Sequence, residues 1–137
     1  MNRVCPTTAG RVSICLAARA ENIGRAREFV AAALGAAHPC APVLQLIVSE
    51  LVTNSVVHSR SGQRDGGTVT VALLGTPTGV RVEVTDDGGP GLPRLRAVDF
   101  GAESGRGLHL VDALAAAWNC ARDPAGTTTT WAEVIAD

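Results

Sequence analysis

The stretch ELVTNSVVH, residues 50–58, lies inside a longer apolar segment and decides how the rest of the chain is interpreted. Pro42 fits the first turn of a helix that we expect to cover residues 42–58. Glu50, Asn54 and His58 are four residues apart, so they share one stripe of that helix. An apolar stripe lies beside it, formed by Leu44, Val48, Leu51, Val52 and Ser55. This periodicity predicts a helix with one face on a core and one polar face.

The polar stripe has two interpretations. A carboxylate and a carboxamide one turn apart can serve one site, in which the glutamate takes a proton or orients a nucleophile. The amide oxygen is then a neutral ligand suited to Mg²⁺, which keeps waters and substrate phosphates as its other ligands. The alternative is a solvated helix face without chemistry, which most helices carry.

A second candidate site follows the β-rich segment 80–85 and reads DDGGPG, residues 86–91. Strand alternation places Asp86 at the strand end, and consecutive glycines let the backbone approach a flat or bulky ligand. A carboxylate there can accept a hydrogen bond from an exocyclic amine such as that of adenine. An ordinary turn is the alternative, although the loop is longer and richer in glycine than a short connection needs.

The third candidate is ESGRGLHLV, residues 103–111, in which Gly105 and Gly107 open an amphipathic segment. We expect a helix over residues 107–117, whose N-terminal amides can bind phosphate. Arg106 can add a charge-assisted contact. The alternative is a flexible helix cap. The segment is not a dinucleotide-binding fingerprint, because no strand precedes it and it lacks GxGxxG.

The remaining patterns predict the order of the elements. Alternation predicts strands over residues 11–18, 68–74, 80–85, 118–122 and 127–135, and helical spacing predicts a first helix over 21–37. Residues 1–10 are expected to be a loose N-terminus and 59–67 a loop. Hairpin-linked strands with separate helices predict an α+β fold, with helices on one face of an antiparallel or mixed sheet. Residues 11–137 are expected to form one domain.

The composition excludes several function classes. All 12 basic residues are arginine. The P-loop and the protein kinase fold each hold phosphates with a lysine, so both kinds of ATP site are disfavoured. A formal net charge of −1 argues against a dedicated nucleic-acid binder. Because no apolar run approaches a membrane span and the N-terminus lacks a signal-peptide core, a cytoplasmic location is expected. Cysteine spacing predicts free thiols, with Cys15 and Cys120 in the core.

Together the three segments resemble the Bergerat-fold (GHKL) ATP-binding superfamily of gyrase, the heat-shock chaperone, histidine kinases and the mismatch-repair ATPase. There, an N box on a helix, a DxGxG-like box and a GxG-like box surround ATP. The pattern ELVTNSVVHS is most similar to the N box of small bacterial anti-sigma-factor serine/threonine kinases, and GRGLHLV and TTWAEV are similar to segments of single-domain regulatory members. The resemblance covers roughly residues 10–136. It implies a two-layer α/β sandwich with helices on one face of a mixed, mostly antiparallel sheet.

The resemblance also implies roles for matching residues. Glu50 matches the catalytic base that activates a serine hydroxyl of a partner protein, Asn54 matches the Mg²⁺ ligand, and Asp86 matches the aspartate that binds the adenine amine. Thr129 matches the threonine beside the adenine, and His58 matches a frequent N-box histidine of unassigned role. The implied nucleotide-binding residues are Asn54, His58, Asp86, Asp87, Gly88, Gly89, Gly91, Leu92, Gly105, Arg106, Gly107, Leu108 and Thr129.

Two departures from the family pattern leave alternatives open. The glycine loop holds one residue more than the simple DxGxG spacing, so that strand register favours Asp86 as the adenine reader whereas glycine spacing alone favours Asp87. Residues 92–104 match the ATP lid, which is short here. A short lid weakens the case for kinase activity more than the case for nucleotide binding.

The resemblance implies two functions of different classes. In the first, the chain binds Mg-ATP, phosphorylates a STAS-type anti-sigma-factor antagonist, and sequesters a sigma factor until that antagonist competes. A homodimer is a further expectation, and no contact with nucleic acid or membrane is expected. In the second, ATP only sets the shape of a binding module. A detached histidine-kinase catalytic domain is disfavoured by the N-box glutamate and histidine and by the short lid.

Overall fold

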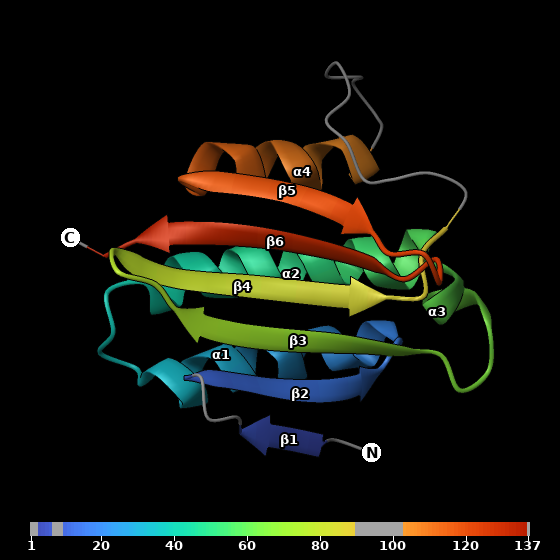
Figure 1. Cartoon of the computed structure of the whole chain (residues 1–137), viewed down its shortest axis with the longest axis horizontal. Helices are drawn as coiled ribbons and strands as arrows, with labels where there is room; N and C mark the ends of the chain where they lie inside the picture. Colours follow the sequence, from blue (N-terminus) through green and yellow to red (C-terminus); the bar gives the residue numbers. More distant parts are fainter. Residues whose placement is uncertain (1–2, 7–9, 90–102, 137) are drawn as a thin grey trace.

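The computed structural model describes residues 3–6, 10–89 and 103–136, whose strands form one six-stranded sheet (Figure 1). Every described pairing is antiparallel, and the strand order is β1-β2-β3-β4-β6-β5. The α+β prediction is confirmed, with antiparallel pairing throughout the described sheet. The strands are β1 (Arg3–Pro6), β2 (Arg11–Ala17), β3 (Thr68–Gly75), β4 (Gly79–Asp86), β5 (Ala117–Arg122) and β6 (Thr128–Ile135).

The helices cover one face of this sheet. Figure 1 shows α1 and α2 behind the strands, with α2 behind β4 and β6 and α4 beside β5. Among the described helices, none has both the length and the apolar composition that crossing a bilayer requires. The helical segments are η1 (Ala20–Asn22), α1 (Ile23–Leu34), α2 (Ala41–His58), α3 (Arg60–Gln63) and α4 (Glu103–Leu114).

Alternation along the strands explains the core. Val80, Val82 and Val84 of β4 are buried in the hydrophobic cluster that also holds the apolar stripe of α2. Each fully buried aliphatic side chain contributes roughly 1.5–3 kcal/mol, so this stripe holds α2 on the sheet. All five predicted stripe residues are buried: Leu44, Val48, Leu51, Val52 and Ser55. The predicted helix with one buried face is therefore confirmed.

The opposite face of the sheet carries an ion network. Glu83 accepts hydrogen bonds from Arg11 Nη1 (2.6 Å) and Arg81 Nε (2.9 Å), and Arg81 Nη1 also donates to Glu133 (3.2 Å). The Arg81 guanidinium lies over Trp131, 4.1 Å from the ring centroid. Burial alone would raise the pKa of Glu83, but the hydrogen bonds and charges of Arg11 and Arg81 outweigh it and lower that pKa. The network therefore stabilises the ionised carboxylate.

Several predicted boundaries are wrong. The first helix ends at Leu34 rather than at 37, because Gly35 takes a φ of 91°, which side-chain-bearing residues rarely adopt. Residues 3–6 pair with β2 instead of being loose, and the loop predicted over 59–67 contains α3. Ser59 caps α3, since its Oγ accepts a hydrogen bond from the Ser61 N–H (3.1 Å). α4 begins at Glu103, before the predicted start at 107.

The cysteine predictions are partly confirmed. Within the described part of the chain, Cys15, Cys40 and Cys120 form no disulfide, as their spacing predicts. The core position expected for Cys15 and Cys120 is wrong, because both are half-buried, and the described thiol in the core is that of Cys40.

Glu83→Gln should lower the free energy of unfolding at neutral pH by about 1–2 kcal/mol, between the values for exposed and buried ion pairs. Because folding lowers the pKa of Glu83, its contribution is present above the ordinary pKa of a glutamate. This contribution to stability is lost as the pH falls through the lowered pKa of Glu83. Urea unfolding should therefore show the two stabilities converging at acid pH.

Glu133→Gln is the matched control, because Glu133 is more exposed (37% against 16% for the side chain of Glu83). We expect a loss below about 0.5 kcal/mol for this variant. Equal losses for the two variants, or a Glu83 effect undiminished at acid pH, would contradict the role assigned to the network.

Candidate functional site

The last residue of β4, Asp86, meets the buried face of α2. Ser55 Oγ donates a hydrogen bond to Asp86 Oδ2 (2.5 Å), and the Gly88 N–H donates to Oδ1 (2.7 Å). Ser55 is a polar residue in the apolar stripe, and it is only 4% exposed. The packing of α2 on the sheet therefore determines where the Asp86 carboxylate lies.

The environment of Asp86 disfavours its charge. Burial raises the pKa of Asp86, and the nearby charge of Asp87 acts in the same direction. The bonds from Ser55 and Gly88 and the positive charge of Arg122 oppose this rise without cancelling it. An ionised carboxylate has about four lone-pair positions, so Asp86 keeps acceptor capacity for a ligand amine.

Asp87 turns toward α3 instead. Its Oδ2 accepts hydrogen bonds from Arg64 Nε (2.9 Å) and Nη2 (2.5 Å), and its N–H donates to Ser61 Oγ (2.8 Å). The side chain is 36% exposed. Of the two aspartates left open by the sequence, the geometry therefore favours Asp86 as the ligand-facing one.

Strand register places the threonines of β6. Asp86 pairs with Thr128, and Thr85 pairs with Thr129, so only the first pair lies on the helix-covered face. The Thr129 hydroxyl is 2.9 Å from that of Thr85, on the opposite face. Side chains alternate between faces, so a shift of one residue moves the hydroxyl to the other side, and the geometry favours Thr128 over the predicted Thr129. Thr128 is the threonine beside Asp86.

The hydroxyl of Thr128 is buried and has no hydrogen-bond partner within the described part of the chain. An unsatisfied buried polar group costs about 1–3 kcal/mol. Thr128 Oγ1 lies only 3.1 Å from the point that a Cβ on Gly88 would occupy, so it adjoins the loop after β4. A ligand with a complementary polar edge could satisfy this hydroxyl.

The loop after β4 is packed between two other segments. A Cβ on Gly88, whose φ is 79°, would lie 2.2 Å from the Gly126 carbonyl oxygen in the turn before β6. A Cβ on Gly89 would lie 2.8 Å from the carbonyl oxygen of His58 at the end of α2. Glycine is therefore required here by packing within the chain, a role that the sequence did not indicate.

The polar stripe of α2 is oriented away from the core. Glu50 and Asn54 are half-buried and His58 is exposed. None of these side chains makes a hydrogen bond or ion pair to any residue in the described parts of the chain. Asn54 precedes Ser55, so the amide stands next to the residue that binds Asp86. The helix can offer one amide oxygen and one carboxylate to a ligand.

Several contacts of the site could not be read from the sequence. Arg122 Nη2 donates to the Gly89 carbonyl oxygen (2.6 Å), and the Arg60 N–H donates to the Gly88 carbonyl oxygen (2.7 Å). A contact of Ser55 could have been predicted, because a polar residue at a buried helical position usually has a hydrogen-bond partner. The contact of Arg122 could not have been predicted, since it is one of several arginines and lies far from the loop in sequence.

The other predicted site residues are placed as follows. Leu108 is buried in the hydrophobic core, so its side chain has a packing role. Gly91 and Leu92 lie outside the described residues, as do most of the predicted lid and the side chain of Arg106. Gly105 and Gly107 both lie inside α4, whose first described residue is Glu103, so Gly107 does not open this helix.

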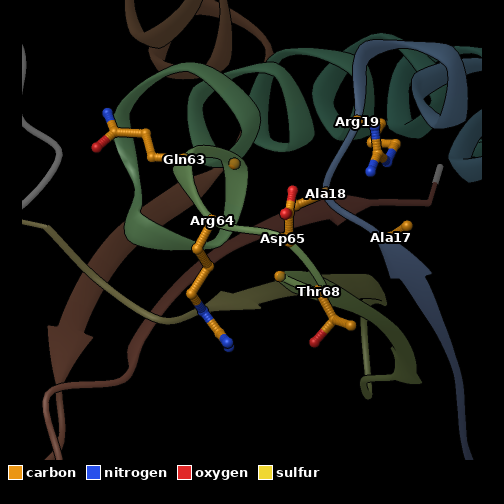
Figure 2. A pocket seen from close by; sticks show the side chains of 10 residues that line it. Ala17, Ala18, Arg19, Gln63, Arg64, Asp65 and Thr68 are labelled. Atoms are coloured by element: carbon orange, nitrogen blue, oxygen red, sulfur yellow. The ribbon is translucent and has the colours of Figure 1, made fainter.

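A separate cavity of about 360 Å³ lies between the end of β2 and the segment joining α3 to β3 (Figure 2). Its lining consists of residues 17–19 and 62–68, which include no predicted site residue. Arg64 and Asp65 point in opposite directions in Figure 2, and Arg64 reaches Asp87. The cavity wall is thus linked to the loop after β4, but the candidate site is the Asp86 end of α2.

Comparison with known proteins finds a family profile that covers most of the chain. The profile of the histidine kinase-like ATPase domain matches residues 16–132, which include α2, the loop after β4, α4 and most of β6. A search of curated proteins finds no match. An ATPase domain implies ATP binding, and the fold described above is consistent with it. The chain therefore belongs to the histidine kinase-like ATPase domain family.

Proposed function

We propose that this chain is an ATP-dependent protein serine/threonine kinase of the anti-sigma-factor type. The observation that supports it is the arrangement on α2, where Ser55 binds Asp86 while Glu50 and Asn54 have no partner among the described residues. One helix thus offers groups to both the base and the phosphates of ATP. The similarity of ELVTNSVVHS to the N box of anti-sigma-factor kinases supports the finer assignment.

In this proposal the adenine base contacts both Asp86 and Thr128 from the helix-covered face of the sheet. Asp86 accepts a hydrogen bond from the exocyclic amine, and Thr128 Oγ1 gains the partner that it lacks in the described structure. Hydrogen bonds to charged groups contribute about 1.5–3 kcal/mol each. Base binding accounts for a half-buried carboxylate and an unsatisfied buried hydroxyl on adjacent strands.

Mg²⁺ fits the phosphate end through the Asn54 amide oxygen, which has no partner among the described residues. One or two protein ligands suffice when phosphates and waters complete its coordination, and bound Mg²⁺ neutralises phosphate charge. The N-terminal end of α4 carries partial positive charge, which favours binding of the phosphates there. No lysine is needed for such a site.

Phosphoryl transfer then requires a base for the attacking hydroxyl. Glu50, one turn before Asn54, accepts the proton of a serine or threonine hydroxyl. The hydroxyl oxygen forms a bond to the γ-phosphorus, the bond from that phosphorus to the β–γ bridging oxygen breaks, and ADP leaves. The proposed substrate is a STAS-type antagonist in the cytoplasm, and the proposed further partners are a sigma factor and a second copy of this chain.

Glu50→Gln should reduce transfer of labelled phosphate from Mg-ATP to a purified STAS-type antagonist domain by roughly a hundredfold or more. The Kd for Mg-ATP should stay within about twofold, because Glu50 acts on the hydroxyl and not on the nucleotide. Radiolabel transfer and isothermal titration calorimetry measure the two quantities.

Glu28→Gln on α1 is the matched control, since Glu28 is exposed and lies on a different helix. It should change neither quantity. Undiminished transfer by Glu50→Gln would contradict the assigned base. Tight ATP binding by the wild type without transfer to any antagonist tested would instead favour the ATP-dependent binding module.

The base end can be tested with two matched pairs of variants. Asp86→Asn should weaken ATP binding by at least about tenfold, and Thr128→Val by about threefold to tenfold. Neither should lower the melting temperature, because one removes a disfavoured charge and the other an unsatisfied hydroxyl. Calorimetric titration and thermal unfolding measure both effects.

The controls are Asp87→Asn and Thr129→Val, one residue away on the same segments. Asp87 pairs with Arg64 and Thr129 with Thr85, so ATP affinity should stay within about twofold for both. If Asp87→Asn or Thr129→Val causes the larger loss, the assignment of the base-binding pair is wrong.

A further inference from the structure

The last residue of β4 and the loop that follows it are held by different elements. α2 binds Asp86 through Ser55, and the segment around α3 binds Asp87. The Gly89 carbonyl oxygen accepts a hydrogen bond from Arg122 Nη2 (2.6 Å), in a partly buried contact. Because Arg122 is the last residue of β5, this bond ties the loop to the edge strand of the sheet.

Strand register explains how Arg122 reaches the loop. Asp86, Thr128 and Arg122 are paired in register on β4, β6 and β5, so their side chains share one face. Adjacent strands are about 4.8 Å apart, so Arg122 starts about 10 Å from Asp86 and extends past β6 to the Gly89 carbonyl. A long side chain with a charged donor is needed for that distance.

We propose that Arg122 is a positioning residue for base recognition, which holds the loop after β4 so that Asp86 and Thr128 form a base-binding pair before the ligand arrives. This inference rests on the proposed function, because it assigns a role at the same base site. The bond from Arg122 is charge-assisted and partly buried, unlike the exposed pair of Arg64 and Asp87. A loop held in its binding conformation loses less entropy when the ligand binds.

The charge of Arg122 also acts on Asp86. Burial is the main cause that raises the pKa of Asp86, Asp87 raises it further, and Arg122 lowers it. The charge of Asp87 is itself paired with Arg64 of the segment after α3. Removing the positive charge of Arg122 should therefore raise the pKa of Asp86 further, so that this carboxylate becomes protonated at a higher pH.

The test compares Arg122→Gln and Arg122→Lys with the wild type by measuring the Kd for ATP over a range of acid to neutral pH. Arg122→Gln should bind ATP about tenfold more weakly at neutral pH. The pH below which its affinity declines should lie above that of the wild type. Arg122→Lys keeps the charge but loses the guanidinium geometry, so its affinity should fall while the pH of the decline stays near the wild-type value.

Arg25→Gln is the matched control, because Arg25 is exposed on α1, and it should reproduce the wild-type values. Wild-type affinity and pH profile in Arg122→Gln would overturn the inference. If Arg122→Gln does not fold, Arg122→Lys decides, and unchanged affinity in that variant overturns the inference. A wild-type protein that binds no ATP would overturn the proposed function itself, and this outcome is distinct from a failure of Arg122 alone.

Discussion

The hydrogen bond from Ser55 to Asp86 is the constraint on which the candidate site depends. It joins the buried face of α2 to the end of β4. The aliphatic stripe allows α2 only one rotation on the sheet, because any other would expose Leu44, Val48 and Leu51. That rotation brings Ser55 to Asp86 and leaves Asn54 and Glu50 outside the core. Core packing and site geometry are therefore set by the same helix rotation.

The free protein holds groups at this end of the sheet that do not favour stability. Asp86 is half-buried with a raised pKa, and the buried hydroxyl of Thr128 has no partner among the described residues. Groups that reduce stability are expected where a protein binds a ligand, and the rest of the structure compensates for them. Here Asp86 and the loop after it are held by α2, the α3 segment and Arg122. A rigid support of this kind can keep unsatisfied groups in a binding geometry.

Much of the fold could be predicted from local patterns. The 42–58 helix has strong periodicity over many residues, and the hairpin of β3 and β4 consists of two β-rich segments joined by the turn sequence GTPTG, residues 75–79. Short elements were missed because they depend on contacts outside themselves. α3 has one turn and relies on the Ser59 cap, and β1 exists by pairing with β2. Neither carries a pattern long enough to indicate a regular element.

The residue types at the candidate site can be recognised from local sequence: a glutamate and an asparagine one helical turn apart, two adjacent aspartates, a glycine loop and a run of threonines. Which of these residues meet depends on how the helices and strands pack. Side chains alternate faces along a strand, so the pairing of β4 with β6 selects Thr128 over Thr129 as the neighbour of Asp86. Asp87 and Arg122 find partners distant in the chain, at Arg64 and Gly89. Such pairings arise from strand register and helix packing, which act between segments and leave no local signal.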